Sequence, residues 1–152
     1  MLKIVCGAGN EDCESVKRLV FVYAKAGCKY FDISARKEIL EAAKEAVSLA
    51  GLEDAHFCVS VGIKGDRHIT KAKIKESVCI KCGNCLRNCP NDAIFPSIMV
   101  NDKRCIGCGT CAKKCPTGAM TMYEKDINVK EILPYMVENG AVSYTHLRAH
   151  ET

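Results

Sequence analysis

The sequence has no long apolar run and no export signal. No stretch approaches the roughly 18 apolar residues that a membrane span needs. The opening residues, MLKIVCGAGN, lack the basic flank and the apolar core of a signal peptide. We therefore expect a cytoplasmic protein without a membrane span. With 152 residues, 48% of them hydrophobic, the chain is long enough for one ordinary domain or two small ones.

Cysteine, in contrast, is abundant. Eight of the twelve cysteines fall in two blocks, CIKCGNCLRNCP (Cys79–Pro90) and CIGCGTCAKKCP (Cys105–Pro116), which repeat at an offset of 26 residues. In a small exported protein such a count would suggest disulfides. Because the chain has no export signal and the cysteines are tightly grouped, metal ligation by reduced thiols is the better interpretation.

Each block has the spacing C-x2-C-x2-C-x3-C-P. Three thiolates so close together allow one loop to wrap a compact inorganic core and to offer each sulfur to a different iron. The fourth cysteine comes one helical turn later, so it points away from its own loop and ligates the other cluster. Structural zinc, the main alternative, usually takes two separated pairs of ligands. The pattern therefore predicts two [4Fe–4S] clusters.

On these motifs, residues 76–124 resemble a bacterial-type two-cluster ferredoxin domain. The resemblance implies that one cluster is bound by Cys79, Cys82, Cys85 and Cys115. It implies that the other is bound by Cys105, Cys108, Cys111 and Cys89.

The formal charge of the chain is only +4. Two oxidised clusters with four thiolates each would add about −2 apiece, so the loaded protein would be nearly neutral. No nucleic-acid partner is predicted. Basic residues that fringe the motifs are interpreted mainly as a solvated face, although they could also steer a redox partner. They are Lys81, Arg87, Lys103, Arg104, Lys113 and Lys114.

Residues 1–63 alternate between strand-like and helix-like patterns and predict a β/α domain. The expected strands start about 27 residues apart and are Leu2–Gly7, Cys28–Ser34 and His56–Ile63. Between them, apolar residues recur at helical spacing and stop at Gly27 and at Gly51. Ser34 is a candidate N-cap for the second helix. Crossover helices make the strands pair in parallel, so the fold class is α/β.

Two further segments flank the cysteine motifs. Residues 64–75, KGDRHITKAKIK, are polar and lysine-rich, and we interpret them as a solvated linker rather than a docking patch for an acidic partner. Residues 125–141 resume helical periodicity and predict a helix that returns to the β/α domain. Pro134 places the start of the regular helix near itself.

A longer resemblance covers the first half of the chain. The stretches LKIVCGAGNED, VYAKAGCKYFDIS and VSVGIKGDRH, placed before a ferredoxin module, are similar to the light-dependent period protein family of iron–sulfur proteins. That resemblance implies a barrel-like β/α domain, interrupted after its third strand by an inserted α+β two-cluster ferredoxin-like domain.

The last eleven residues, VSYTHLRAHET, resemble the in-frame translation of a transposase adapter used to prepare sequencing libraries. We therefore expect residues 142–152 to be an artefactual tail outside the fold. The natural sequence would then be cut near Ala141, the chain would be a truncated fragment, and His146 and His150 would carry no chemistry.

The remaining candidate residues have structural interpretations. Buried, unreactive thiols are expected at Cys6, Cys13, Cys28 and Cys58. The loop Gly7–Asn10 is interpreted as a tight turn, with an anion site as the alternative. Asp32 closes the second expected strand, where it could cap the next turn or contact a small ligand at the carboxyl ends of the strands.

The sequence favours electron transfer or redox sensing through two clusters, with a redox partner protein. Two alternatives remain open. One is a β/α-barrel oxidoreductase that receives electrons from its own ferredoxin module, and the other is a redox-sensing regulatory interaction protein. No acid–base pair or nucleophile stands out in residues 1–75, so no catalytic residue is assigned and a non-enzyme is favoured.

Overall fold

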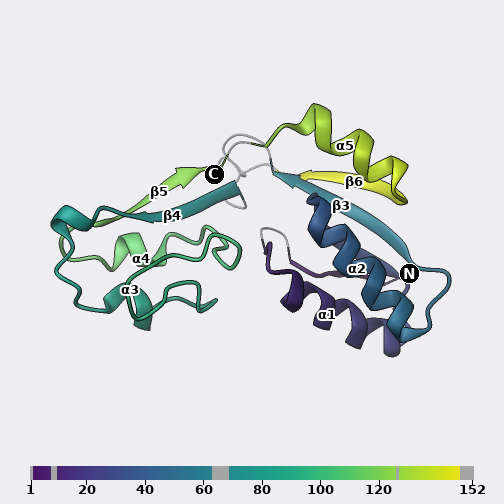
Figure 1. Cartoon of the computed structure of the whole chain (residues 1–152), viewed down its shortest axis with the longest axis horizontal. Helices are drawn as coiled ribbons and strands as arrows, with labels where there is room; N and C mark the ends of the chain where they lie inside the picture. The colour runs from purple at the N-terminus through teal and green to yellow at the C-terminus, as the bar shows by residue number, and fades with distance from the viewer. Residues whose placement is uncertain (1, 8–9, 63–68, 126, 148–152) are drawn as a thin grey trace.

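The computed structural model describes residues 2–7, 10–62, 69–125 and 127–147. It contains a four-stranded parallel sheet in the order β1-β2-β3-β6 and a two-stranded antiparallel sheet, β4-β5. Figure 1 shows the two sheets in separate units that lie side by side. We call residues 69–125 the cysteine module, and the remainder of the described chain the β/α unit. In chain order the cysteine module lies between β3 and α5. The α/β class predicted from the sequence is confirmed.

The parallel sheet of the β/α unit is built from strands close to those expected. Its strands are β1 Lys3–Val5, β2 Tyr30–Ser34, β3 His56–Gly62 and β6 Ala141–Leu147. Phe31 and Ile33 of β2 and Val59 of β3 point into the main apolar core. Because side chains alternate along a strand, Asp32 points to the opposite face of the sheet. The sheet thus has one apolar face and one face with polar side chains.

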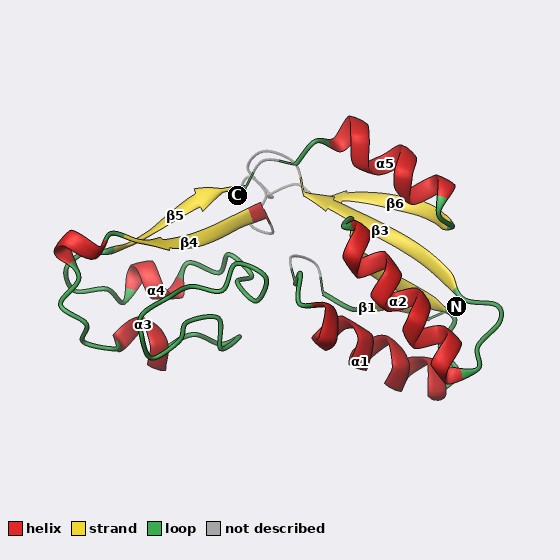
Figure 2. Ribbon diagram, in the orientation of Figure 1, coloured by secondary structure: helices red, strands yellow, loops and turns green. Residues whose placement is uncertain are grey.

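Helices α1 Cys13–Lys25 and α2 Lys37–Ala50 supply the other half of that core. Each buries one stripe, which includes Val16 and Val20 in α1 and Leu40 in α2. Both helices therefore pack on the same face of the sheet, as Figure 2 illustrates with helices in red. Among the described residues, no helix combines the length and the apolar character that crossing a membrane would require.

The sequence predicted the C-terminal end of α2 correctly but not its N-cap. The helix stops at Gly51 as expected, because this residue adopts the left-handed conformation, with φ of 73°, that glycine tolerates best. The N-cap expectation was wrong. Ser34 is the last residue of β2, and the N-cap is Arg36, whose side chain makes no capping hydrogen bond. The backbone carbonyl of Ser34 instead accepts a hydrogen bond from the N–H of Arg36 at 2.8 Å.

Helix α5, Val129–Glu138, begins earlier than Pro134 suggested, because this proline lies inside the helix. The helix packs on the β/α unit, where Met136 is fully buried in the main core. The ammonium of Lys37 in α2 lies 4.4 Å from the ring centroid of Tyr135. Burial of this apolar stripe stabilises the helix despite the missing N–H of the proline.

We expected residues 142–152 to lie outside the fold, and this was wrong for residues 142–147, which belong to strand β6. Strand β6 pairs in parallel with β3, from Phe57 opposite Ala141 to Gly62 opposite Leu147. The physical reason is that β3 is an almost fully buried strand whose second edge needs a hydrogen-bonding partner. His146 therefore belongs to a strand, whereas His150 lies outside the described residues.

The cysteine module starts earlier than the sequence suggested. Thr70–Ile74, placed by the sequence in a solvated linker, form β4, which pairs antiparallel with β5, Met120–Glu124. Lys71 in this strand is fully buried. The rest of the linker, through His68, lies outside the described residues. Three one-turn elements complete the module, namely η2 Glu76–Val78, α3 Asn84–Arg87 and α4 Thr110–Lys113.

Met136 offers a direct test of the contact between α5 and the β/α core. We expect Met136→Ala to lower the free energy of unfolding by about 2–5 kcal/mol, because it leaves a cavity in a fully buried site. The neighbouring Val137 is 61% exposed, and Val137→Ala should change stability by less than about 0.5 kcal/mol. Urea denaturation of both variants makes the comparison, and equal losses would contradict this packing.

Candidate metal centre

The first cysteine motif is arranged on a loop that leads into α3. Cys79 follows η2, Cys85 lies in α3, and Cys89 comes shortly after that helix. Between the first two elements Lys81 and Gly83 adopt left-handed conformations, with φ of 52° and 74°. These conformations turn the chain so that the backbone N–H of Lys81 donates to the sulfur of Cys79 at 3.4 Å.

The second motif repeats this arrangement before α4. Gly107 and Gly109 have φ of 69° and 72°, and Gly109 caps α4 as Gly83 caps α3. Cys105 and Cys111 are buried, whereas Cys108 is exposed. The two loops differ in surroundings, because the N–H that reaches Cys105 comes from Ala72 in β4, at 3.4 Å.

The sulfur of the fourth cysteine of each motif accepts a hydrogen bond from a backbone N–H that follows it in the chain. The N–H of Ala93 donates to the sulfur of Cys89 at 3.2 Å. The N–H of Met120 is the main reason that the pKa of Cys115 lies below its usual value, since it stabilises the thiolate. Such N–H groups are the donors that tune an iron–sulfur centre.

The eight cysteines line two separate cavities. The first cavity is lined by Cys79, Cys82, Cys85 and Cys115. The second is lined by Cys105, Cys108, Cys111 and Cys89. Each cavity thus combines three cysteines of one motif with the fourth cysteine of the other. The remaining walls are largely apolar, with Ile98 and Met120 in the first and Ile94 and Met122 in the second.

The cavities suit soft, compact groups that take thiolate ligands. Burial raises the pKa of the Cys111 thiol to about 11 and also raises that of Cys85. Ligand binding must therefore displace protons from these thiols, so affinity should increase with pH. Among the residues that the structure describes, no group of three or more His, Cys, Asp or Glu side chains is placed to hold a single metal ion.

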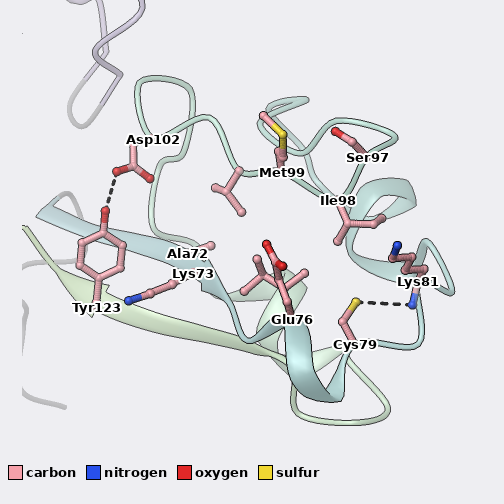
Figure 3. A pocket seen from close by; sticks show the side chains of 12 residues that line it. Ala72, Lys73, Glu76, Cys79, Lys81, Ser97, Ile98, Met99, Asp102 and Tyr123 are labelled. Carbon is pink, nitrogen blue, oxygen red and sulfur yellow. Dashed lines mark hydrogen bonds between the residues drawn. The ribbon is translucent and has the colours of Figure 1, made fainter.

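An open groove lies beside the first cavity (Figure 3). It encloses about 880 Å³ between β4 and the segment that includes Ile98, Met99 and Asp102. Cys79 forms part of its wall, so this groove brings solvent close to the first cavity. The hydroxyl of Tyr123 donates to Asp102 across one end of the groove, and this bond raises the pKa of Tyr123 to about 12.

A smaller cavity of about 160 Å³ opens at the carboxyl ends of β1 and β2, where the sequence suggested a small ligand. Its walls are charged, and the cysteine module contributes Lys103 and Lys125 to them. From the β/α unit come Glu11, Cys13, Arg36, Glu38 and Ile39. Asp32 does not line this cavity. It accepts hydrogen bonds from the ammonium of Lys3, at 2.7 Å, and from the hydroxyl of Ser60.

The four cysteines outside the two motifs and the loop Gly7–Asn10 were the other candidates from the sequence. The expectation of buried thiols is confirmed for Cys6 and Cys58 but wrong for Cys13 and Cys28, which are partly exposed. In the loop Gly7–Asn10, the N–H of Asn10 donates to the carbonyl of Gly7 at 3.0 Å, as in a tight turn, and residues 8 and 9 lie outside the described part.

Sequence reasoning missed Glu11 and Lys71, which contact each other between the two units. The only signal was the alternation in KAKIK, which places every second residue of β4 on one face.

Comparison with known proteins identifies the cysteine module. Residues 72–122 match a family model described as a 4Fe-4S dicluster domain. A comparison of the chain with curated proteins gives no match. The segment that carries both motifs is therefore a ferredoxin-type iron–sulfur domain, as its spacing indicated, and it includes β4 from Ala72 onward.

Cys6 provides a test of the interpretation of the remaining cysteines as inert thiols. Burial raises its pKa to about 12, so the thiol stays protonated, and therefore unreactive, at mildly alkaline pH. In the folded protein at mildly alkaline pH, we expect iodoacetamide to leave Cys6 and Cys58 unmodified, as read by mass spectrometry. The same residues should react after unfolding. Rapid alkylation of Cys6 in the folded state would contradict its burial.

Proposed function

We propose that this protein transfers single electrons through two [4Fe–4S] clusters held by the cysteine module. The observation that carries the proposal is the presence of two cavities, each lined by four cysteines. Four thiolates are the usual ligand set of a [4Fe–4S] cluster, and two such sets agree with a dicluster domain. Such clusters, when bound, accept and release one electron at a time.

The proposed ligand sets cross between the motifs. Cys115 joins the three leading cysteines of the first motif, and Cys89 joins those of the second. The lining of the two cavities supports this assignment. So does the x3 spacing, since α3 and α4 carry the chain away from each loop before the fourth cysteine. Each motif then depends on the other for a complete set of ligands.

The protein groups around the proposed clusters have three roles. Apolar side chains such as Ile94 and Met120 exclude water and lower the local dielectric constant. Backbone N–H groups, including those of Ala72 and Ala93, donate to cysteine sulfurs and favour the added negative charge of the reduced state. The groove at Cys79 leaves one wall of the first cavity accessible to a redox partner protein.

We further propose that the β/α unit belongs to a barrel-like domain into which the cysteine module is inserted after β3. Two features support this arrangement. The parallel strands follow one another in the order β1-β2-β3-β6, with helices packed on one face, as in a β/α barrel. The polar cluster around Asp32 lies on the opposite face, which would be the interior of a barrel. In this proposal the β/α unit binds a partner protein or a small ligand, and the clusters sense or change the redox state of that bound molecule.

One observation favours the oxidoreductase as a second candidate. The charged cavity at the carboxyl ends of the strands includes Lys103, two residues from Cys105, so a substrate there would lie near the second cluster. A reaction would have to depend on the side chains of this cavity. Loss of substrate turnover in Arg36→Met, with iron content unchanged, would favour the enzyme over a carrier of electrons.

The cofactor content is the first test. Protein purified without oxygen should be brown and contain about eight irons and eight sulfides per chain, because two four-iron clusters are expected. Iron and acid-labile sulfide assays, together with the visible absorption spectrum, make the measurement. Colourless protein with stoichiometric zinc would contradict the proposal.

The crossed ligand sets make a separate prediction. Cys115→Ala should convert the centre of the first motif to a three-iron form, or remove it, and leave the centre of the second motif largely intact. Cys89→Ala should do the opposite. Mössbauer and EPR spectra can follow each centre, with independent assignment by substitutions at Cys82 and Cys108. Damage confined to the centre of the substituted motif would show that each motif binds its own cluster.

A further inference from the structure

Among the described residues, one short segment of the β/α unit makes hydrogen bonds and ion pairs with the cysteine module. Glu11 and Asp12, which precede α1, contact Lys103 and Arg104 at the start of the second motif. The backbone N–H of Glu11 donates to the carbonyl of Lys103 at 2.8 Å. The guanidinium of Arg104 donates to the carboxylate of Asp12 at 2.9 Å. This contact places the second motif next to the β/α unit, while Cys79 of the first motif follows η2 at the far end of the module.

A buried lysine lies at the centre of this contact. The side chain of Lys71 is 0% exposed, and its ammonium donates to the backbone carbonyl of Cys105 at 2.7 Å. The carboxylate of Glu11 is 3.5 Å from the same ammonium. Burial lowers the pKa of Lys71, and the negative charge of Glu11 opposes that shift. The ammonium thus lies directly beside one of the proposed cluster ligands.

Glu11 is held in its ionised form by the surrounding cations. Burial alone would raise its pKa, but the hydrogen bond from Lys125, at 3.0 Å, and the charges of Lys71 and Arg36 outweigh burial and lower it. Its side chain is only 11% exposed. The β/α unit therefore supplies a fixed negative charge that partly neutralises Lys71.

The first motif has no equivalent buried cation among the described residues. Lys81, within the first motif, contacts Cys79 through its backbone N–H, and its side chain is exposed beside the open groove. Water screens a charge in that position, whereas a charge in the low-dielectric interior acts at nearly full strength. The two centres therefore differ in the positive charge that each experiences.

We propose that Lys71 makes the centre of the second motif easier to reduce than the centre of the first, and that Glu11 limits this difference. The inference rests on the proposed two-cluster function. One electron, supplied by a one-electron donor protein, adds one negative charge, and no bond is made or broken. Lys71 stabilises that charge on the second centre, so the electron resides on the centre nearest the β/α unit. Displacement of Glu11 would then change the potential, which links contact between the units to the redox state.

Two substitutions of opposite charge test the proposal. Lys71→Met should lower the potential of the second centre, and Glu11→Gln should raise it. At a fixed dithionite-poised potential, we expect each variant to change the ratio of reduced to oxidised second centre by about tenfold, which corresponds to about 59 mV for a one-electron couple. EPR-monitored redox titration measures both centres, assigned through substitutions at Cys82 and Cys108.

The chain offers matched controls. Lys73 lies two residues along β4 with its side chain exposed, and Glu14 is exposed three residues after Glu11. Lys73→Met and Glu14→Gln should leave the ratio within twofold of the unmodified protein. Shifts as large as those of the test variants would overturn the proposal, because they would reflect net charge alone.

Iron content separates this inference from the proposed function. Unmodified protein without two clusters contradicts the proposed function itself. Full iron loading with unchanged potentials in Glu11→Gln overturns only the role of Lys71 and Glu11. Because Glu11 lies outside the cysteine module, this variant decides the question even if Lys71→Met fails to fold. A shift of both test variants in the same direction also overturns the inference.

Discussion

The contact of Lys71 with Glu11 and with the backbone of Cys105 is the constraint on which the arrangement of this protein depends. A fully buried ammonium is costly unless a carboxylate and a hydrogen-bond acceptor meet it. Here the carboxylate comes from the β/α unit and the carbonyl from the second cysteine motif. Lys71 itself lies on the first strand of the module. The need to satisfy one charge thus brings together three segments that are distant in the sequence.

This constraint gives the two nearly identical motifs different surroundings. The left-handed backbone conformations of the two loops repeat at equivalent positions, as Gly83 and Gly109 illustrate. Yet Cys105 lies beside a buried cation and against a second unit, whereas Cys79 forms the wall of an open groove. Under the proposed electron-transfer function, two equivalent centres would exchange electrons without preference. The unequal surroundings would instead favour electron transfer in one direction, between the solvent-facing groove and the charged cavity at the carboxyl ends of β1 and β2.

Several parts of the fold could be predicted from local sequence patterns. The three strands and two helices of residues 1–63 follow from periodicity and from the glycines that end helices. Errors occurred where tertiary contacts outweighed local preference. The lysine-rich residues Thr70–Ile74 look solvated, but pairing with β5 makes them a strand. Pro134 lies inside α5 because burial of Met136 favours the helix across it. Residues after Ala141 form β6 because β3 has an edge to pair.

The sequence by itself determined the identity of the proposed ligands, because the spacing of thiols within a motif is a local property that one loop and one helical turn express. It also determined the parallel β/α pattern, which depends on short-range periodicity. The same spacing also predicted the crossed ligand sets, which the lining of the two cavities supports. Only the tertiary structure decided which cation lies beside the second motif, because the contact of Glu11 with Lys71 joins residues that are distant in the chain. Burial and charge pairing decide such a contact, and no spacing along the sequence encodes it.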